Sequence, residues 1–141
     1  MEYLTHSLIN KSDTLNIIKK LKAEKYSWQD GKKTAGSYAA KIKNNFQLDK
    51  DSNLSIEIKD LIINKIISNP LLKSFTLPSL IHGVMFTKSL AGNGYGLHID
   101  NPYMPSGRSD LSFTLFLNEP NDYQGGELCI QTINNNEKIK L

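Results

Sequence analysis

The N-terminal part of the chain alternates apolar and polar residues with helical spacing. Between residues 15 and 21, leucine and isoleucine recur every third position with lysines between them. This pattern predicts a helix over about residues 13–25, with Ser12 or Asp13 as its N-cap. A turn is expected at Asp30-Gly31, and the residues that follow have mixed character.

A second helix is predicted over about residues 53–68, capped by Asp51 or Ser52. The sequence Asn69-Pro70 should end it, because the residue before a proline avoids helical geometry. Its buried stripe is expected to consist of Leu54, Ile58, Leu61, Ile62 and Ile66.

Beyond Pro78 the apolar residues form short runs that are rich in strand formers and bounded by Gly, Pro or Asn. Such runs predict the strands of a β-sandwich or barrel. The expected strands are residues 80–90, 95–100, 110–118, 126–133 and 137–141. In the third of these, one face is formed by Leu111, Phe113, Leu115 and Leu117. Helices followed by strands indicate an α+β fold, one domain with a helical and mixed part over residues 1–78 and a β part over 79–141.

Composition narrows the functional classes. The 141 residues are 39% hydrophobic and 22% charged, which is ordinary for one soluble globular domain. The net charge of +3 is small and no segment interleaves basic with aromatic residues, so no nucleic-acid partner is expected. Neither a transmembrane run nor a signal peptide is predicted, which favours a cytoplasmic protein without a membrane partner. The single cysteine, Cys129, excludes an internal disulfide and a thiol-based zinc site.

His98 and Asp100 are the residues with the clearest chemical potential. On a strand over residues 95–100 their side chains would point to the same side, where an imidazole and a carboxylate can bind one metal ion. Two histidines and one carboxylate on one face of an octahedron form the site of non-haem iron(II) oxygenases. A lone triplet of this kind is a weak signal, and a strand-end histidine followed by a turn aspartate is the alternative interpretation.

Three separated motifs give the triplet a context. Residues 28–51 contain W-x-D-G, T-x-G and K-x-N-x-Q-L, and residues 95–103 read YGLHIDNPY. Residues 108–131 contain R-[ST]-D-L-S, T-L-F-L and Y-x-G-G-E-L in that order. With these motifs the sequence resembles the PKHD-type hydroxylases, a branch of the iron(II)/2-oxoglutarate dioxygenases related to prolyl 4-hydroxylases. The order and gaps of the motifs match from about residue 10 to the end of the chain.

The resemblance implies a fold and a ligand set. The fold would be a double-stranded β-helix, or jelly roll, with the N-terminal helices packed on it. His98 and Asp100 would be the first two iron ligands, and Tyr95 and Thr114 would line the 2-oxoglutarate pocket.

The resemblance also implies a reaction. Iron(II), 2-oxoglutarate and O₂ would hydroxylate an unactivated C–H bond, on a prolyl or another peptide side chain or on a small molecule, and ascorbate would keep the iron reduced. The loop from Asn101 to Arg108 would form the substrate side of the pocket. Arg108 and Asp110 are expected to form an ion pair that orders this loop.

The sequence departs from the family pattern in two places. The family's third iron ligand, a histidine on a later strand, and the arginine that binds the distal carboxylate of 2-oxoglutarate have no counterpart among these residues, and neither His6 nor His82 matches a ligand position. The β-helix is therefore expected to be truncated before its last strands. Thr87 and Ser89 replace an asparagine and a tyrosine, which predicts an altered cosubstrate pocket.

Two interpretations of function follow. In the first, the chain is an incomplete copy of an iron(II)/2-oxoglutarate oxygenase. In the second, it is a catalytically inactive fragment, or a jelly-roll ligand-binding module, that lacks the third iron ligand.

Overall fold

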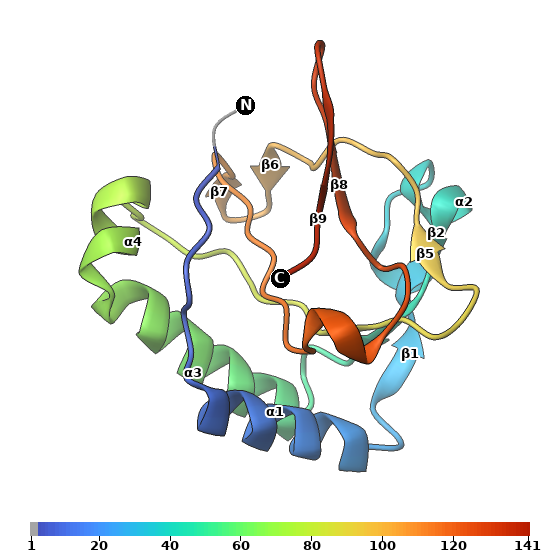
Figure 1. Cartoon of the computed structure of the whole chain (residues 1–141), viewed down its shortest axis with the longest axis horizontal. Helices are drawn as coiled ribbons and strands as arrows, with labels where there is room; N and C mark the ends of the chain where they lie inside the picture. Colours follow the sequence, from blue (N-terminus) through green and yellow to red (C-terminus); the bar gives the residue numbers. More distant parts are fainter. Residues whose placement is uncertain (1–2) are drawn as a thin grey trace.

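The computed structural model describes residues 3–141 as a mixture of helices and small antiparallel sheets (Figure 1). The helical elements are α1 (Lys11–Ala23), the 3-10 turn η1 (Gly31–Thr34), α2 (Ala39–Ile42), α3 (Asn53–Ser68), α4 (Pro70–Thr76) and the 3-10 turn η2 (Pro120–Asp122). The strands are β1 (Trp28–Asp30), β2 (Lys43–Asn44), β3 (Phe46–Leu48), β4 (Thr87–Lys88), β5 (Gly94–Tyr95), β6 (Tyr103–Met104), β7 (Gly107–Arg108), β8 (Leu128–Gln131) and β9 (Asn136–Ile139). This arrangement is compatible with the predicted α+β class.

Both long helices begin at a side-chain cap. Helix α3 starts after Ser52, as predicted, and the Ser52 hydroxyl accepts a hydrogen bond from the Ser55 amide at 3.2 Å. Helix α1 starts two residues earlier than predicted. Its N-cap is Asn10, whose side-chain oxygen accepts from the Asp13 amide at 2.8 Å. The prediction of Ser12 or Asp13 as the cap was wrong, because asparagine is an equally good cap and lies one turn ahead.

Helix α4 is absent from the predicted elements. Asn69 ends α3 as expected, but it also caps α4 by accepting from the Leu72 amide at 3.0 Å. Pro70 therefore occupies the first turn of a new helix, where its missing N–H costs nothing. Among the helices of residues 3–141, none combines the length and the apolar character needed to cross a bilayer.

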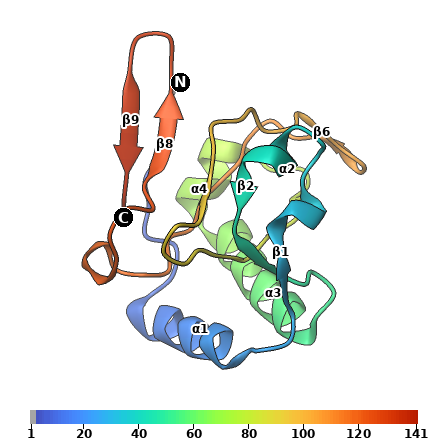
Figure 2. The same ribbon diagram turned by 90° about the vertical axis from the view of Figure 1, so that its right-hand side faces the viewer.

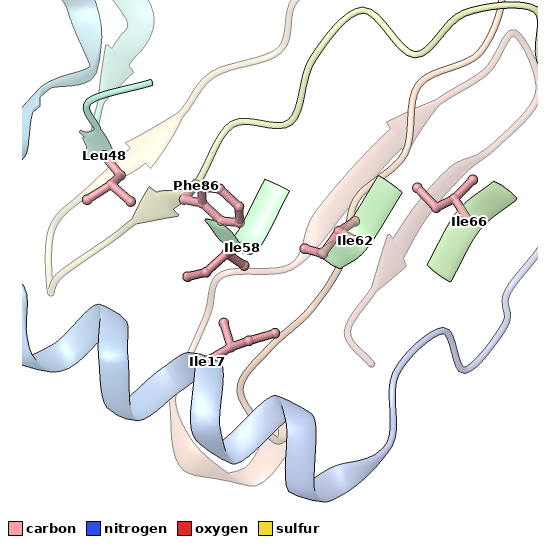
Figure 3. Packing of buried hydrophobic residues seen from close by; sticks show 6 residues of the cluster. All are labelled: Ile17, Leu48, Ile58, Ile62, Ile66 and Phe86. Carbon is pink, nitrogen blue, oxygen red and sulfur yellow. The ribbon is translucent and has the colours of Figure 1, made fainter. Parts of the chain in front are cut away.

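The hydrophobic core lies where α1 and α3 pack against β3 and the segment before β4 (Figure 3). Its buried members are Ile17, Leu48, Ile58, Ile62, Ile66 and Phe86. The stripe predicted for α3 is confirmed, since three of its five residues are buried and the other two, Leu54 and Leu61, pack at the edge of the core. This core holds the end of β3, at Leu48, against the two long helices.

The sheets are small and separate. Strands β1, β3 and β4 form a three-stranded antiparallel sheet with β3 in the middle, and β2 pairs with β5. The hairpins β6–β7 and β8–β9 are independent two-stranded units. In Figures 1 and 2 the β8–β9 hairpin projects away from the helices.

The predicted strands exceed the observed ones. Of residues 80–90 only β4 is a strand, and of residues 95–100 only Tyr95 belongs to β5. The last two predicted strands are confirmed in place as β8 and β9.

Residues 110–118 form no regular structure, so the strand predicted there is wrong. A strand exists only through hydrogen bonds to a neighbour, and within residues 3–141 no segment pairs with this run. As a result Leu111 and Phe113 are half exposed, whereas Leu115 and Leu117 pack at the edge of the core.

Replacing Ile62 by alanine is expected to lower the free energy of unfolding by about 2–5 kcal/mol, because Ile62 is only 1% exposed and its loss opens a cavity. Chemical denaturation followed by circular dichroism measures the change. The matched control is Ile67→Ala in the same helix, where the side chain is 49% exposed and the effect should stay within about 1 kcal/mol. Equal losses for the two variants would contradict the assignment of the core.

Candidate metal site

The pairing of β5 with β2 determines the position of the segment that carries the site. Lys43 lies opposite Tyr95, and the Gly96 amide donates to the Ile42 carbonyl at 2.9 Å. A Cβ on Gly96 would lie 3.0 Å from the Cβ of Ile42, so glycine permits this close approach. The pairing therefore fixes where the chain emerges toward His98.

His98 and Asp100 lie together, although not on a strand as predicted. The His98 Nε2 is 3.3 Å from the Asp100 Oδ1. The His98 Nδ1 lies 2.8 Å from the Gly96 carbonyl oxygen, and because a carbonyl only accepts, Nδ1 carries the hydrogen. This contact leaves the lone pair of Nε2 beside the carboxylate.

The pair fits one metal ion. A histidine ligand commonly donates its other ring N–H to a backbone carbonyl, as His98 does to Gly96. Two donors that each lie about 2.1 Å from one ion at right angles are about 3 Å apart, close to the observed separation. Within residues 3–141, no group of three or more His, Cys, Asp or Glu side chains could hold an ion, so the third ligand is not supplied by the described residues.

Tyr95 covers one face of the His98 imidazole. Its ring stacks on the His98 ring with centroids 3.8 Å apart and planes at 17°. Burial raises the pKa of Tyr95 above its usual value, and the Asp100 charge adds to this shift. The phenol therefore stays protonated, and remains a hydrogen-bond donor, to higher pH.

The remaining predicted residues make no hydrogen bond or ion pair with His98 or Asp100 within residues 3–141. Thr114 is exposed, and no hydrogen bond within residues 3–141 joins it to His98 or Asp100. Asn101 accepts from the Tyr103 amide at 3.1 Å and starts the β6–β7 hairpin. The structure thus forms the predicted loop but does not bring Thr114 to the metal pair.

The β6–β7 hairpin is held at its base by Arg108. The predicted ion pair is present, since the Arg108 Nε is 2.7 Å from the Asp110 Oδ1. The Arg108 carbonyl also accepts from the His82 Nε2 at 2.8 Å, and the His82 Nδ1 lies 2.7 Å from the Ser106 hydroxyl. His82 is therefore a structural histidine that ties the hairpin to the preceding segment.

The chain was compared with known protein families and proteins. No family model matches it. A protein named PKHD-type hydroxylase NATL1_16191, from Prochlorococcus marinus strain NATL1A, is 80% identical over all 141 residues. The PKHD-type hydroxylases of strains NATL2A and MIT 9313 are 79% and 55% identical over the same length.

Over its whole length the chain is thus similar to proteins named PKHD-type hydroxylase. The resemblance inferred from the three motifs is confirmed. The chain spans 64% of the length of these relatives.

Residues of the first motif, over residues 28–51, form a buried polar cluster that the sequence alone did not predict. Lys43, Asn45 and Gln47 alternate along one face of the β2–β3 segment, and each is at least 93% buried. The Thr34 hydroxyl accepts a hydrogen bond from the Lys43 ammonium at 3.2 Å and also contacts the side-chain oxygen of Gln47. Their period of two indicates that these polar side chains share one face of the segment, but it does not indicate that this face is buried.

Gly31 explains the glycine of the W-x-D-G motif. Its amide donates to the Asn45 carbonyl at 2.9 Å. A Cβ at this position would lie 2.0 Å from the Asn45 Oδ1 and 3.1 Å from the Lys43 Cε. Only glycine leaves room for these two side chains.

Replacing Gly31 by alanine is expected to lower the free energy of unfolding by about 1–3 kcal/mol, because the added methyl group overlaps the Asn45 side chain. Thermal denaturation measures the effect. Gly36→Ala is the matched control, since a Cβ there meets nothing within 4 Å. A Gly31→Ala protein that is as stable as the Gly36→Ala protein would contradict the packing of this motif.

Proposed function

We propose that the chain is the larger part of an iron(II)- and 2-oxoglutarate-dependent hydroxylase that acts on a C–H bond of a prolyl or another peptide side chain. The support is the His98–Asp100 pair, with its 3.3 Å spacing and its Nε2 lone pair directed by the Gly96 carbonyl. The names of the relatives support the hydroxylase class.

His98 and Asp100 would hold the metal, and a third ligand would come from outside the described residues. Iron(II) bound there would supply the oxidation of the C–H bond by O₂ at the expense of 2-oxoglutarate, and ascorbate would keep it reduced. Tyr95 would orient His98 by stacking and would donate its phenol hydrogen to an oxygen of the cosubstrate. Thr114 would join the 2-oxoglutarate pocket only after residues 110–118 pair as a strand.

The fold proposed for the whole enzyme is a double-stranded β-helix. The half-exposed Leu111 and Phe113 support it, because alternating apolar residues on an unpaired extended segment are suited to burial between two sheets. The β6–β7 hairpin, from Asn101 to Arg108, would form the substrate side of the pocket, where its exposed Tyr103 can contact a peptide.

A second function is a jelly-roll module that binds a carboxylate ligand without chemistry. Two features favour it. The first is that the described residues supply only two of the three ligands. Serine at position 89, where the family has tyrosine, also removes a contact to the cosubstrate. The two functions differ in whether 2-oxoglutarate is consumed. Release of succinate with iron(II) and O₂ indicates the hydroxylase, whereas binding without turnover indicates the module.

The metal site can be tested with histidines labelled with ¹³C, because the chain has only His6, His82 and His98. Addition of Mn²⁺, a redox-stable substitute for iron(II), is expected to broaden the His98 signal first. Two protein ligands bind weakly, so millimolar metal is appropriate. Asp100→Asn should raise the Mn²⁺ concentration required by on the order of tenfold. In His98→Ala, neither of the remaining signals, from His6 and His82, should broaden selectively.

His6→Ala is the matched control, since His6 is exposed and lies outside the site, and it should leave the broadening of His98 unchanged. Equal broadening of all three histidine signals at every Mn²⁺ concentration would sink the proposed metal site.

A further inference from the structure

Lys43 is a buried cation next to the candidate metal site formed by His98 and Asp100. Its residue is only 4% exposed. The ammonium contacts the Thr34 hydroxyl at 3.2 Å and lies 5.1 Å from the centroid of the Tyr95 ring. Among the described residues, no carboxylate lies within ion-pair distance of it, and Asp30 acts on it only from farther away.

Burying a charge without a partner of opposite sign is costly. Burial lowers the pKa of Lys43 from its usual value, and the Asp30 charge offsets only part of this effect. An apolar side chain of similar length could fill the space that the Lys43 side chain occupies without the cost of burying a charge. The ammonium is therefore not explained by packing, and such departures from the local rules are expected at functional sites.

One of the two contacts of the Lys43 ammonium, the Tyr95 ring, connects it to His98. Lys43 and Tyr95 are register partners in the β2–β5 pair, which places their side chains next to each other on the same side of the pair. The Tyr95 ring in turn stacks on His98 at 3.8 Å. A cation beside a ring is attracted to its electron-rich face, most strongly when water is excluded.

We propose that Lys43 is a positioning residue for the metal site, which holds the Tyr95 ring and through it sets the orientation of the His98 imidazole. The proposal rests on the proposed function for its purpose, but its geometry stands apart from any metal. The proposal gives a role to the K-x-N-x-Q-L motif. Its lysine, Lys43, supports the first metal ligand, His98, through the Tyr95 ring.

The test uses the ¹³C-histidine-labelled chain without metal. An aromatic ring stacked on an imidazole shifts the imidazole proton signals upfield, so the His98 Hε1 signal should lie upfield of those of His6 and His82. Lys43→Met, which keeps the length and removes the charge, should move this signal toward the other two. With Mn²⁺ added, it should raise the concentration that broadens the His98 signal by about threefold or more, the fold-change expected from a cation–π contact.

Lys41→Met is the matched control, because Lys41 is exposed in α2 and two residues away. It should leave the His98 signal unchanged. Tyr95→Leu should abolish the upfield shift, and adding Lys43→Met to it should cause no further change, because Lys43 acts through the ring. Far-UV circular dichroism and the melting temperature identify variants that have lost the fold.

A Lys43→Met protein that keeps the parent fold and the parent His98 signal overturns the proposal. The parent chain gives a second test that needs no variant, namely nuclear Overhauser contacts from the Lys43 side chain to the Tyr95 ring and from that ring to His98. Their absence also overturns it. Failure of Mn²⁺ to broaden His98 in the parent chain, with these contacts present, would refute the metal site and leave the positioning role standing.

Discussion

The segment from Lys43 to Leu48 has one buried polar face, and its other face reaches the hydrophobic core at Leu48. Leu48 enters the core between α1 and α3, and Phe86 and Ile58 pack in the same cluster. The opposite face carries the polar side chains that reach Thr34 and Tyr95. One segment therefore connects the hydrophobic core to the candidate site. Because packed interiors transmit small displacements, the position of the site depends on the core.

Aromatic rings, rather than carboxylates, contact Lys43 of β2 and Lys88 of β4. Lys88 lies over the rings of Trp28 and Phe46, at 4.3 and 5.6 Å from their centroids, as Lys43 lies over Tyr95. A carboxylate beside Lys43 would add a second negative charge near Asp100 and could itself bind a metal ion. A neutral ring stabilises the cation and leaves Asp100 as the single carboxylate contact of His98 in the described chain.

The parts of the fold that local sequence determines were predictable. Helix α3 has its predicted bounds because Ser52 caps it and Asn69 precedes a proline. Residues 110–118 were predicted wrongly, because alternation signals a strand only if a partner segment pairs with it. Helix α4 escaped prediction because Pro70 is a signal both for the end of one helix and for the first turn of the next.

The candidate site shows the same division. The identities of His98 and Asp100 were readable, because a donor pair two residues apart needs only extended backbone to meet. The polar cluster could not be predicted, because no local sequence pattern indicates that a lysine is buried.

The His98–Asp100 geometry does not depend on a continuous strand. The Gly96 carbonyl fixes the imidazole from within the same segment, and Tyr95 fixes its plane. The two ligands of the proposed metal site are thus organised by contacts local to β5 and by β2, the strand that pairs with it. A third ligand would complete a pair whose orientation is already set, which lowers the conformational entropy lost when the metal binds.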